Sequence, residues 1–300
     1  MRTTEEFTID GTTLTLSNLE KILYPAVGFA KGHVIDYYTR ISPCMLPHLK
    51  NRAVTFKRYP NGVDKPFFYE KNCPAHRPEW VKTAQVWSKH NDRNMDYCVL
   101  NDRQSLVWAA NLAALELHAS LALANNLDCP TALVFDLDPG EGCNAIDCCE
   151  IALWLNAALT TQHLQSFPKT SGSKGLQVYV PLNTSITFEK TKAHALALAL
   201  QMERDHPERV VHNMRKELRR GKIFIDWSQN DAHKTTVAVY SLRAQPRPFV
   251  STPLPWSEVK RALKSKRLTS LEFDADTVLK RVDEHGDLFA PVATLKQRLK

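Results

Sequence analysis

The sequence has no hydrophobic segment of the kind that carries a protein to or through a membrane. It contains no run of about 18 apolar residues, roughly the length that a membrane-spanning helix needs. Its first residues, MRTTEEFTIDG, are polar and acidic, without the apolar stretch of a signal peptide. We therefore expect a cytoplasmic protein with no membrane partner.

Cysteine-based sites find little support either. The chain has seven Cys, none in a CxxC motif, and only Cys148 and Cys149 are adjacent. Cys143 and these two could be zinc ligands, but a second pair at zinc-finger spacing is missing. Reduced thiols, as in most cytosolic proteins, are the better expectation.

What the chain does contain is enough apolar material for a substantial core. Hydrophobic residues make up 43% of its 300 residues, and six residues are Trp. This size suits one large domain or two small ones. No internal repeat, low-complexity linker or convincing boundary divides the sequence. We therefore expect a single domain over residues 1–300.

Local patterns predict a mixed α/β (α+β) fold with central, mainly antiparallel sheets flanked by helices. Val34, Tyr38 and Ile41, for example, share one face of a helix that begins near Lys31. Helices are predicted over residues 31–49, 105–124, 144–159 and 189–205 and over most of the segment after residue 255; strands are predicted over residues 53–59, 96–100, 132–138, 175–181, 223–227 and 235–241.

A pair of acids ends one of these strands. Residues 132–138 read ALVFDLD, and Pro139-Gly140 follows at once. On a strand, Asp136 and Asp138 lie on one face, because side chains alternate with a period of two. Two such carboxylates repel each other unless a cation lies between them, and they suit hard ions such as Mg²⁺ or Mn²⁺. A DxD pair alone is weak evidence, since many such pairs are solvated turns.

A third acid and a polar loop strengthen the case. Asp226 closes another apolar strand, in KIFIDWSQN, and three Asp on two strands could hold two ions that activate an attacking oxygen and clamp phosphates. Between the two strands lies TSGSKGLQVYVPL, whose N–H groups, hydroxyls and single ammonium suit a triphosphate. The loop lacks Walker spacing, so without the acids an ordinary hairpin turn would explain it equally well.

The net charge of +7 indicates solubility as much as a polyanionic partner. Its distribution is more informative, because basic residues gather in three clusters. We interpret the cluster before Asp226 as a phosphate-contact surface and the last cluster as a solvated helix face. The clusters are Arg209, Arg215, Lys216, Arg219, Arg220 and Lys222; Lys57 and Arg58; and Lys260, Arg261, Lys264, Lys266 and Arg267.

The order of these motifs resembles the archaeo-eukaryotic primase superfamily. The resemblance is closest to the polymerase domain of bacterial ligase D, the repair polymerase of non-homologous end joining. It runs over nearly the whole chain, in the blocks LSNLEKILYP, YPNGVDKPFFYEKN, NLAALELH, FDLDPGEG, TSGSKGL, DWSQN, KTTVAVYSLRA and VSTPLPW. It implies a primase-polymerase catalytic core.

The resemblance also implies roles for individual residues. Asp136, Asp138 and Asp226 would be the catalytic acids and the ligands of two Mn²⁺ or Mg²⁺ ions. Residues 90–94 would help to bring two DNA ends together. Nucleotide binding is implied for Ser171, Ser173, Lys174, Gln177, Lys234, Arg243, Lys57, Arg58, Phe67 and Phe68, and capture of a DNA 5′-phosphate for Lys21 and Lys31. Phe67 and Phe68 would stack on bases, although ordinary core packing remains an alternative for both.

One position departs from the family pattern. Gln177 stands where the family usually has His, in SGxKGLH. Glutamine donates a hydrogen bond but carries no charge, so either nearby bases compensate or activity is reduced. His118, in ELH, does not replace that histidine in sequence position, and we interpret it as a hydrogen-bonded structural residue.

We therefore expect a template-directed repair polymerase, a nucleotidyltransferase that adds nucleotides to 3′ ends at gaps and double-strand breaks, with ribonucleotides preferred. Expected partners are DNA ends or gaps with a 5′-phosphate, NTPs or dNTPs, Ku and a DNA ligase, in a prokaryotic nucleoid. Alternatives are a primase-polymerase that starts chains de novo, a catalytically weakened DNA-end-binding module and a two-metal phosphodiesterase. A KxDG-like ligase site and a nuclease module are missing, so the chain is either stand-alone or part of a larger ligase.

Overall fold

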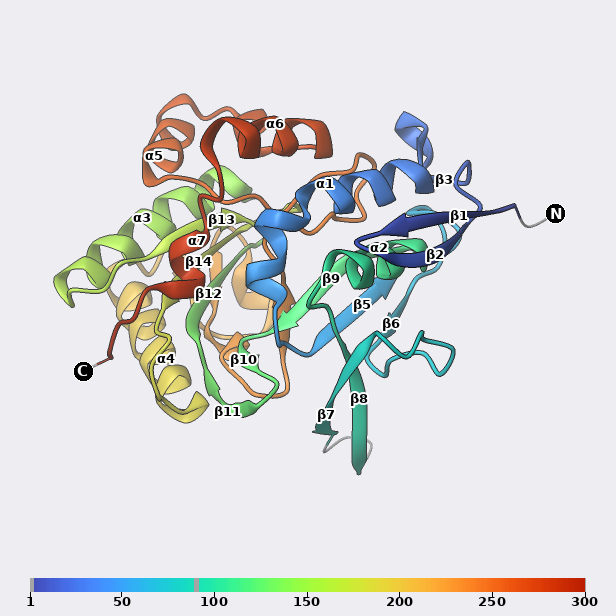
Figure 1. Cartoon of the computed structure of the whole chain (residues 1–300). Helices are drawn as coiled ribbons and strands as arrows, with labels where there is room; N and C mark the ends of the chain where they lie inside the picture. Colours follow the sequence, from blue (N-terminus) through green and yellow to red (C-terminus); the bar gives the residue numbers. More distant parts are fainter. Residues whose placement is uncertain (1–2, 89–91, 300) are drawn as a thin grey trace. The chain divides into compact units, whose positions relative to one another are not determined.

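The computed structural model describes residues 3–88 and 92–299, and contacts within the chain divide it into two compact units. Unit 1 contains residues 1–125, 235–250 and 274–287, and unit 2 contains residues 126–234, 251–273 and 288–300 (Figure 1). In these described ranges, no helix combines the length and the apolar character that crossing a membrane requires.

Unit 1 is built around a six-stranded antiparallel sheet. Its strand order is β17-β9-β5-β8-β7, and β6 pairs with β5. Helix α1 packs against α2 and α6, and α2 also contacts β9. The elements are β1 (Thr4–Ile9), β2 (Thr12–Ser17), β3 (Ile22–Tyr24), η1 (Pro25–Val27), β4 (Phe29–Ala30), α1 (Lys31–Leu49), β5 (Val54–Arg58), β6 (Phe68–Glu70), β7 (Lys82–Ser88), β8 (Arg93–Val99), α2 (Arg103–Asn111), β9 (Ala114–Ser120), β10 (Ala122–Leu123), β17 (Thr235–Val237) and α6 (Ala275–His285).

The helix predicted over residues 105–124 is wrong in its second half. Helix α2 ends at Asn111, Ala113 takes a positive φ of 56°, and the chain continues as β9. Strand β9 lies between β17 and β5, and nearly all of its residues are buried. A strand buried on both faces shows no alternation of polar and apolar residues, so its apolar run looks like that of a buried helix.

Unit 2 contains a five-stranded sheet in the order β13-β14-β12-β16-β15, antiparallel except between β15 and β16. Helices α3 and α4 contact the central strand β12, α7 contacts β14, and α5 packs on α3 (Figure 1). The elements are β11 (Asn126–Pro130), β12 (Ala132–Pro139), α3 (Ala145–Thr161), β13 (Phe167–Thr170), β14 (Leu176–Pro181), α4 (Phe188–Asp205), β15 (Val210–Val211), η2 (Lys216–Arg219), β16 (Ile223–Asp226), η3 (Trp227–Gln229), α5 (Trp256–Ser265), η4 (Leu268–Leu271) and α7 (Ala290–Thr294).

The predicted fold class, a mixed α/β fold with mainly antiparallel sheets, is confirmed. The other predicted helices and strands are present with shifted ends, except that the strand predicted over residues 235–241 is reduced to β17. The strands that the patterns missed are short or lie in small pairings, such as β1–β2 and β3–β4. Short strands carry too few alternating residues to be distinguished from loops.

The expectation of reduced thiols is wrong for two cysteines. Cys73 and Cys98 form a disulfide, with Cα atoms 5.0 Å apart. The Cys73 N–H donates to the carbonyl oxygen of Asp96, which holds the loop beside β8. The two cysteines are 25 residues apart in sequence, and no sequence motif predicts that they pair. Cys143, Cys148 and Cys149 are free thiols.

Candidate functional site

A row of polar side chains crosses the sheet of unit 2. Lys169 of β13 is opposite Gln177 of β14, which is in turn opposite Asp136 of β12. Asp136 is also opposite Asp226 of β16. Opposite residues of antiparallel strands share one face, with Cβ atoms about 4.5–5.5 Å apart. We call Lys169, Gln177, Asp136 and Asp226 the polar row; Asp138 follows on the same face of β12.

The acids of this face repel one another. Burial and the charges of Asp138 and Asp226 raise the pKa of Asp136 to about 7, although a hydrogen bond from Gln177 and the charge of Lys169 act in the opposite direction. One buried ammonium therefore does not balance three carboxylates. An additional cation would be stabilised here.

The Asp226 carboxylate is held by the residues that follow it. Its Oδ1 accepts hydrogen bonds from the N–H of Ser228 (3.0 Å) and from the Ser228 hydroxyl (2.5 Å), and its Oδ2 accepts one from Gln229 Nε2 (2.8 Å). Lys234 Nζ donates to the same Ser228 hydroxyl at 2.5 Å. Lys234, predicted to bind nucleotide, is thus connected to Asp226 through Ser228.

Asn230 explains why this motif lies beside the acidic strand. It is fully buried, and its Oδ1 accepts a hydrogen bond from the N–H of Val134 while its Nδ2 donates to the Val134 carbonyl oxygen. These two bonds fix the DWSQN turn to β12. The sequence identified DWSQN as a shared block, but the roles of Ser228, Gln229 and Asn230 are visible only in the structure.

The predicted phosphate loop leads into β14, which carries Gln177. The Ser171 hydroxyl accepts hydrogen bonds from the N–H groups of Ser173 (3.2 Å) and Gly175 (3.1 Å), which folds the loop. A Cβ on Gly175 would lie 2.0 Å from the carbonyl oxygen of Leu137, so no other residue fits without displacing β12. Ser173 and Lys174 are exposed.

Beside this loop lies a cavity of about 440 Å³. Ser173 and Lys174 line it, together with residues 139–145 and part of η4. Residues 144–145 are the start of α3, where Asn144 Oδ1 accepts a hydrogen bond from the N–H of Ile146 at 2.8 Å. The cavity is large enough for a group of phosphate size next to the predicted loop.

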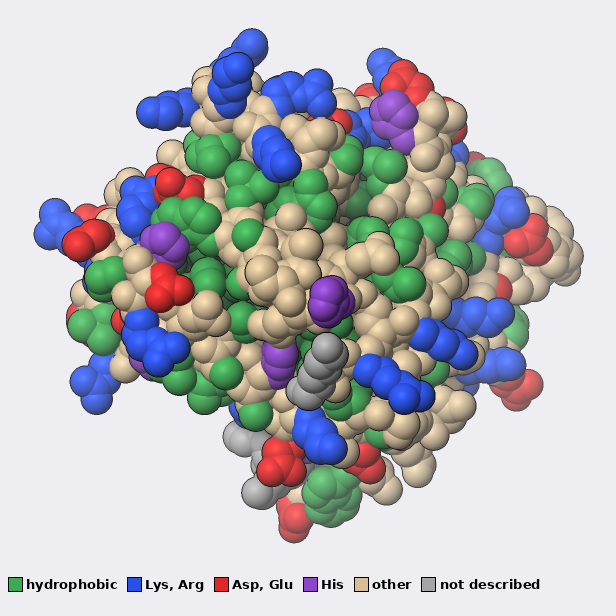
Figure 2. Space-filling model, turned by 90° about the vertical axis from the view of Figure 1, so that its left-hand side faces the viewer, with side chains coloured by type: hydrophobic (Ala, Val, Ile, Leu, Met, Phe, Trp, Pro, Cys, Tyr) green, Lys and Arg blue, Asp and Glu red, His purple; other side chains and the backbone are tan. Residues whose placement is uncertain are grey.

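Two arginines of the basic cluster before Asp226 are engaged by other side chains. Arg209 forms ion pairs with Asp147 (3.0 Å) and Glu150 (2.8 Å) of α3, and Arg219 stacks on Phe224 with its Cζ 3.7 Å from the ring centroid. The last basic cluster, on α5 and the two residues after it, is exposed, and Lys and Arg side chains gather along the upper edge of the face in Figure 2. This exposure agrees with the interpretation as a solvated face.

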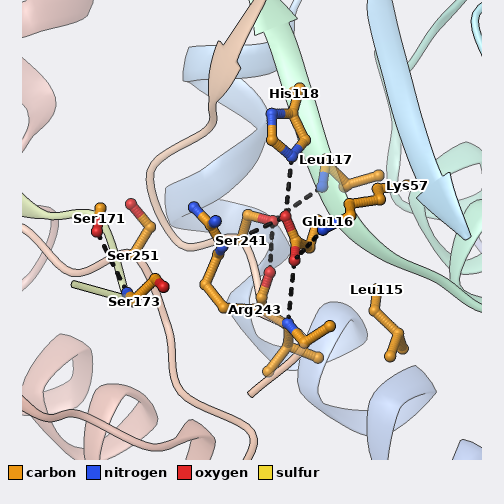
Figure 3. Close-up of polar contacts among 12 residues, drawn as sticks. Lys57, Leu115, Glu116, Leu117, His118, Ser171, Ser173, Ser241, Arg243 and Ser251 are labelled. Atoms are coloured by element: carbon orange, nitrogen blue, oxygen red, sulfur yellow. Dashed lines mark hydrogen bonds and ion pairs between the residues drawn. The ribbon is translucent and has the colours of Figure 1, made fainter. Parts of the chain in front are cut away.

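Unit 1 carries the second group of predicted nucleotide-binding residues, arranged around a buried carboxylate that the sequence did not single out. Lys57 Nζ lies 3.4 Å from Glu116 Oε1, and His118 Nε2 and Arg243 Nε lie 3.0 Å and 3.3 Å from Oε2 (Figure 3). We call Lys57, Glu116, His118 and Arg243 the Glu116 cluster. The interpretation of His118 as hydrogen-bonded is confirmed.

The predicted aromatic pair is exposed, which argues against core packing. Phe67 and Phe68 are 48% and 44% exposed. The Lys57 ammonium lies 4.2 Å from the Phe67 ring centroid, and the Arg58 guanidinium 5.1 Å from that of Phe68. Arg58 also pairs with Glu70 at 2.9 Å. Two aromatic faces backed by cations are thus open to a base.

Lys21 and Lys31 are adjacent through their backbones, because the Lys31 N–H donates to the Lys21 carbonyl oxygen at 2.8 Å. Their side chains differ. Lys21 is exposed and donates to Asn61 Oδ1, whereas Lys31 is buried and donates to the carbonyl oxygen and hydroxyl of Ser17. In the predicted end-bridging segment, residues 90–91 lie outside the described residues, and residues 93–94 begin β8.

The donor set of unit 2 suits a divalent ion, although no group of three His, Cys, Asp or Glu in the described part of the chain is already arranged as a metal site. Asp136, Asp138 and Asp226 offer the carboxylate oxygens that Mg²⁺ and Mn²⁺ prefer. Burial and the charges of Asp138 and Asp226 disfavour the ionised form of Asp136 and raise its pKa, and a bound cation would offset this. These residues therefore fit the group that the sequence predicts.

Comparison with known proteins decides the family. Residues 30–289 match the model of the LigD primase-polymerase domain. The chain belongs to the LigD primase-polymerase family. The predicted family is thereby confirmed, as is the enzyme class, a nucleotidyltransferase of the primase-polymerase superfamily. The family in general requires a divalent metal.

Individual relatives agree with this assignment. The chain is 43% identical over 279 residues to the multifunctional non-homologous end joining protein LigD of Mycolicibacterium smegmatis, covering 92% of this chain and 36% of that protein. It is 31% identical over 274 residues to the bifunctional LigD of Bacillus subtilis, covering 91% and 43%. The chain thus spans less than half the length of these relatives.

A solved structure extends the likeness to three dimensions. The structure described as the polymerase domain from Mycobacterium tuberculosis ligase D in complex with DNA is 36% identical, with a TM-score of 0.87. The match covers 95% of this chain and 99% of that one. The primase-polymerase fold predicted from sequence is therefore present along nearly the whole chain.

Proposed function

We propose that this chain extends DNA 3′ ends at gaps and double-strand breaks during non-homologous end joining. The 3′-hydroxyl oxygen attacks the α-phosphate of the incoming nucleotide and loses its proton, the bond to the β-phosphate breaks, and pyrophosphate leaves. The observation that carries the proposal is the acidic face of unit 2, with three carboxylates on two paired strands of a LigD-family chain.

Asp136, Asp138 and Asp226 would hold two Mn²⁺ or Mg²⁺ ions, which supply charge stabilisation to the attacking and leaving oxygens. Ser228 and Gln229 orient the Asp226 carboxylate. For the nucleotide we assign the phosphates to Ser171, Ser173, Lys174, Gln177, Lys234, Lys57 and Arg243, and base stacking to Phe67 and Phe68 with Arg58 behind them.

The partners follow from the same proposal. Lys21 and Lys31 would bind the 5′-phosphate across a gap, and the nucleotides would be NTPs in preference to dNTPs. The names of the relatives refer to non-homologous end joining, and the solved polymerase domain is in complex with DNA. We extend both to this chain, with Ku and a ligase as partners.

The test is a primer extension on a one-nucleotide gap. A duplex with a labelled 3′ end and a 5′-phosphate downstream is incubated with Mn²⁺ and either NTPs or dNTPs, with Asp136→Asn as the inactive control. We expect one added nucleotide, in greater yield with NTPs. Synthesis without a primer would favour the de novo primase instead, and no addition by the wild type under any of these conditions would refute the proposal.

A further inference from the structure

The Glu116 side chain is buried on β9, in the interior of the unit 1 sheet, and is 1% exposed. Burial alone would raise the pKa of its carboxyl, but the hydrogen bond from His118 and the charges of Arg243, His118 and Lys57 outweigh burial and lower the pKa to about 2. Glu116 is therefore an internal anion. A carboxylate is repelled by phosphate, so it is not itself a nucleotide ligand.

What Glu116 does is bring three basic side chains to one place. Its Oε1 contacts Lys57 Nζ and accepts a hydrogen bond from the N–H of Ala244 at 3.1 Å, and its Oε2 contacts His118 and Arg243. Figure 3 shows the three side chains converging on this one carboxylate from different parts of the chain. Without it, the positive charges of Lys57 and Arg243 would repel each other.

Lys57 spends little of its donor capacity on Glu116. The Lys57 contact, at 3.4 Å, is long for a charge-assisted hydrogen bond, and the ammonium otherwise faces the rings of Tyr59, Phe67 and Tyr69. Arg243 forms an ion pair with the carboxylate through Nε, at 3.3 Å. The cluster thus carries an excess of positive charge around a fixed anchor.

We propose that Glu116 is a positioning residue for nucleotide binding: it holds Lys57 so that the ammonium of Lys57 is presented to the phosphates of the incoming nucleotide. The proposal rests on the proposed function, since it needs a nucleotide substrate. It adds to that function a residue whose action passes entirely through others.

A purely structural role is the competing explanation, because removing one partner of a buried ion cluster destabilises most proteins. The chain offers a matched control. Asp287 is a mostly buried carboxylate of unit 1 that lies 2.8 Å from His48 Nε2 and accepts a hydrogen bond from the Tyr240 hydroxyl at 2.7 Å. None of these three residues belongs to the predicted site.

The experiment compares Glu116→Gln, Glu116→Asp and Asp287→Asn with the wild type in single-nucleotide gap filling. We expect Glu116→Gln to raise KM for the nucleotide about tenfold, as for the loss of a charged anchor, with kcat changed less than about threefold and gap-DNA affinity unchanged. Glu116→Asp, charged but shorter, should fall between. Asp287→Asn should lose thermal stability and keep the wild-type KM.

A double-mutant cycle separates positioning from folding. If Glu116 acts through Lys57, then Glu116→Gln should raise KM much less in a Lys57→Met background than alone. Equal KM values for wild type and Glu116→Gln, or full additivity with Lys57→Met, would overturn the proposal. Should Glu116→Gln not fold, the same cycle with Glu116→Asp decides it. If the wild type adds no nucleotide at all, the proposed function itself fails.

Discussion

The polar row of unit 2 and the Glu116 cluster of unit 1 are built on the same plan with opposite charges. In the first, one buried cation, Lys169, lies in line with acids; in the second, one buried anion, Glu116, lies among bases. The pKa of Asp136 is raised to about 7, whereas that of Glu116 is lowered to about 2.

This difference shows what each unit lacks. The counter-charge is insufficient in unit 2, so the acids are destabilised until cations arrive. In the Glu116 cluster of unit 1, the carboxylate of Glu116 is stabilised by its basic neighbours, and the cluster as a whole retains a net positive charge. In the function that we propose, divalent cations offset the negative charge of the first site, and the second site attracts phosphate.

The largest expected effect is the loss of nucleotide addition when one of the three acids of unit 2 is removed. Replacing Asp136, Asp138 or Asp226 with Asn should reduce nucleotide addition by at least about 10³-fold, because transition-state charge loses its stabilisation. Affinity for gapped DNA should stay near the wild-type value. Extension assays and fluorescence anisotropy measure the two effects, and near-normal extension by any one variant would remove that residue from the metal site.

Replacing the buried cation Lys169 tests whether its positive charge stabilises the acids of unit 2. Lys169 is fully buried and its Nζ donates to the Ser251 hydroxyl at 2.6 Å. Lys169→Met should lower the free energy of unfolding of the metal-free protein by about 2–3 kcal/mol, since Asp136 and Asp226 lose their neighbouring positive charge. Mn²⁺ should restore part of this loss, as seen in the melting temperature.

A second genetic background shows whether the stabilising effect of Lys169 depends on the neighbouring acids. In Asp136→Asn the charge repulsion is smaller, so Lys169→Met should cost less stability there than in the wild type. An identical cost in both backgrounds, unaffected by Mn²⁺, would mean that Lys169 acts only through its packing and its bond to Ser251.

The prediction for the 5′-phosphate is sharpened by the different burial of two lysines. Lys21→Ala should reduce the preference for a 5′-phosphorylated gap several-fold up to about tenfold, because an exposed ammonium pairs with the terminal phosphate. Lys31→Ala should weaken the same preference and should also reduce stability, since Lys31 is buried and bonded to Ser17. Affinities for gaps with and without the phosphate are measured at two salt concentrations, together with the melting temperature of each variant; a preference that survives both substitutions would refute the assignment.

Sequence patterns predicted the acids of this comparison but not their counter-charges. Asp136, Asp138 and Asp226 end apolar strands, and a two-residue period suffices to put the first two on one face. Lys169 becomes part of the row only through the register of β13 on β14, which no local pattern specifies. Glu116 lies in an apolar run, and its partners Lys57 and Arg243 come from distant segments. These counter-charges could be identified only once the pairing of strands distant in sequence was known.

The smallest expected effect concerns Gln177, the one departure from the family pattern in the polar row. It is 2% exposed, it donates a hydrogen bond to Asp136, and its Oε1 is buried without a hydrogen-bond partner. An unpaired buried acceptor is unfavourable. A histidine can donate to Asp136 from one ring nitrogen and, when protonated, presents a second N–H in place of the unpaired oxygen.

Gln177→His should therefore raise kcat/KM for nucleotide addition several-fold, equivalent to roughly 1 kcal/mol. The gain should grow toward acidic pH, because the charged imidazole is the form that adds a charge-assisted donor and histidine titrates in that range. Gln177→Leu, which keeps the volume but loses the donor to Asp136, is the control and should fall below the wild type. Steady-state kinetics of the three proteins on one gapped substrate, at several pH values, decide the matter: a Gln177→His enzyme with no gain at any pH would mean that its neighbours already compensate for the missing charge.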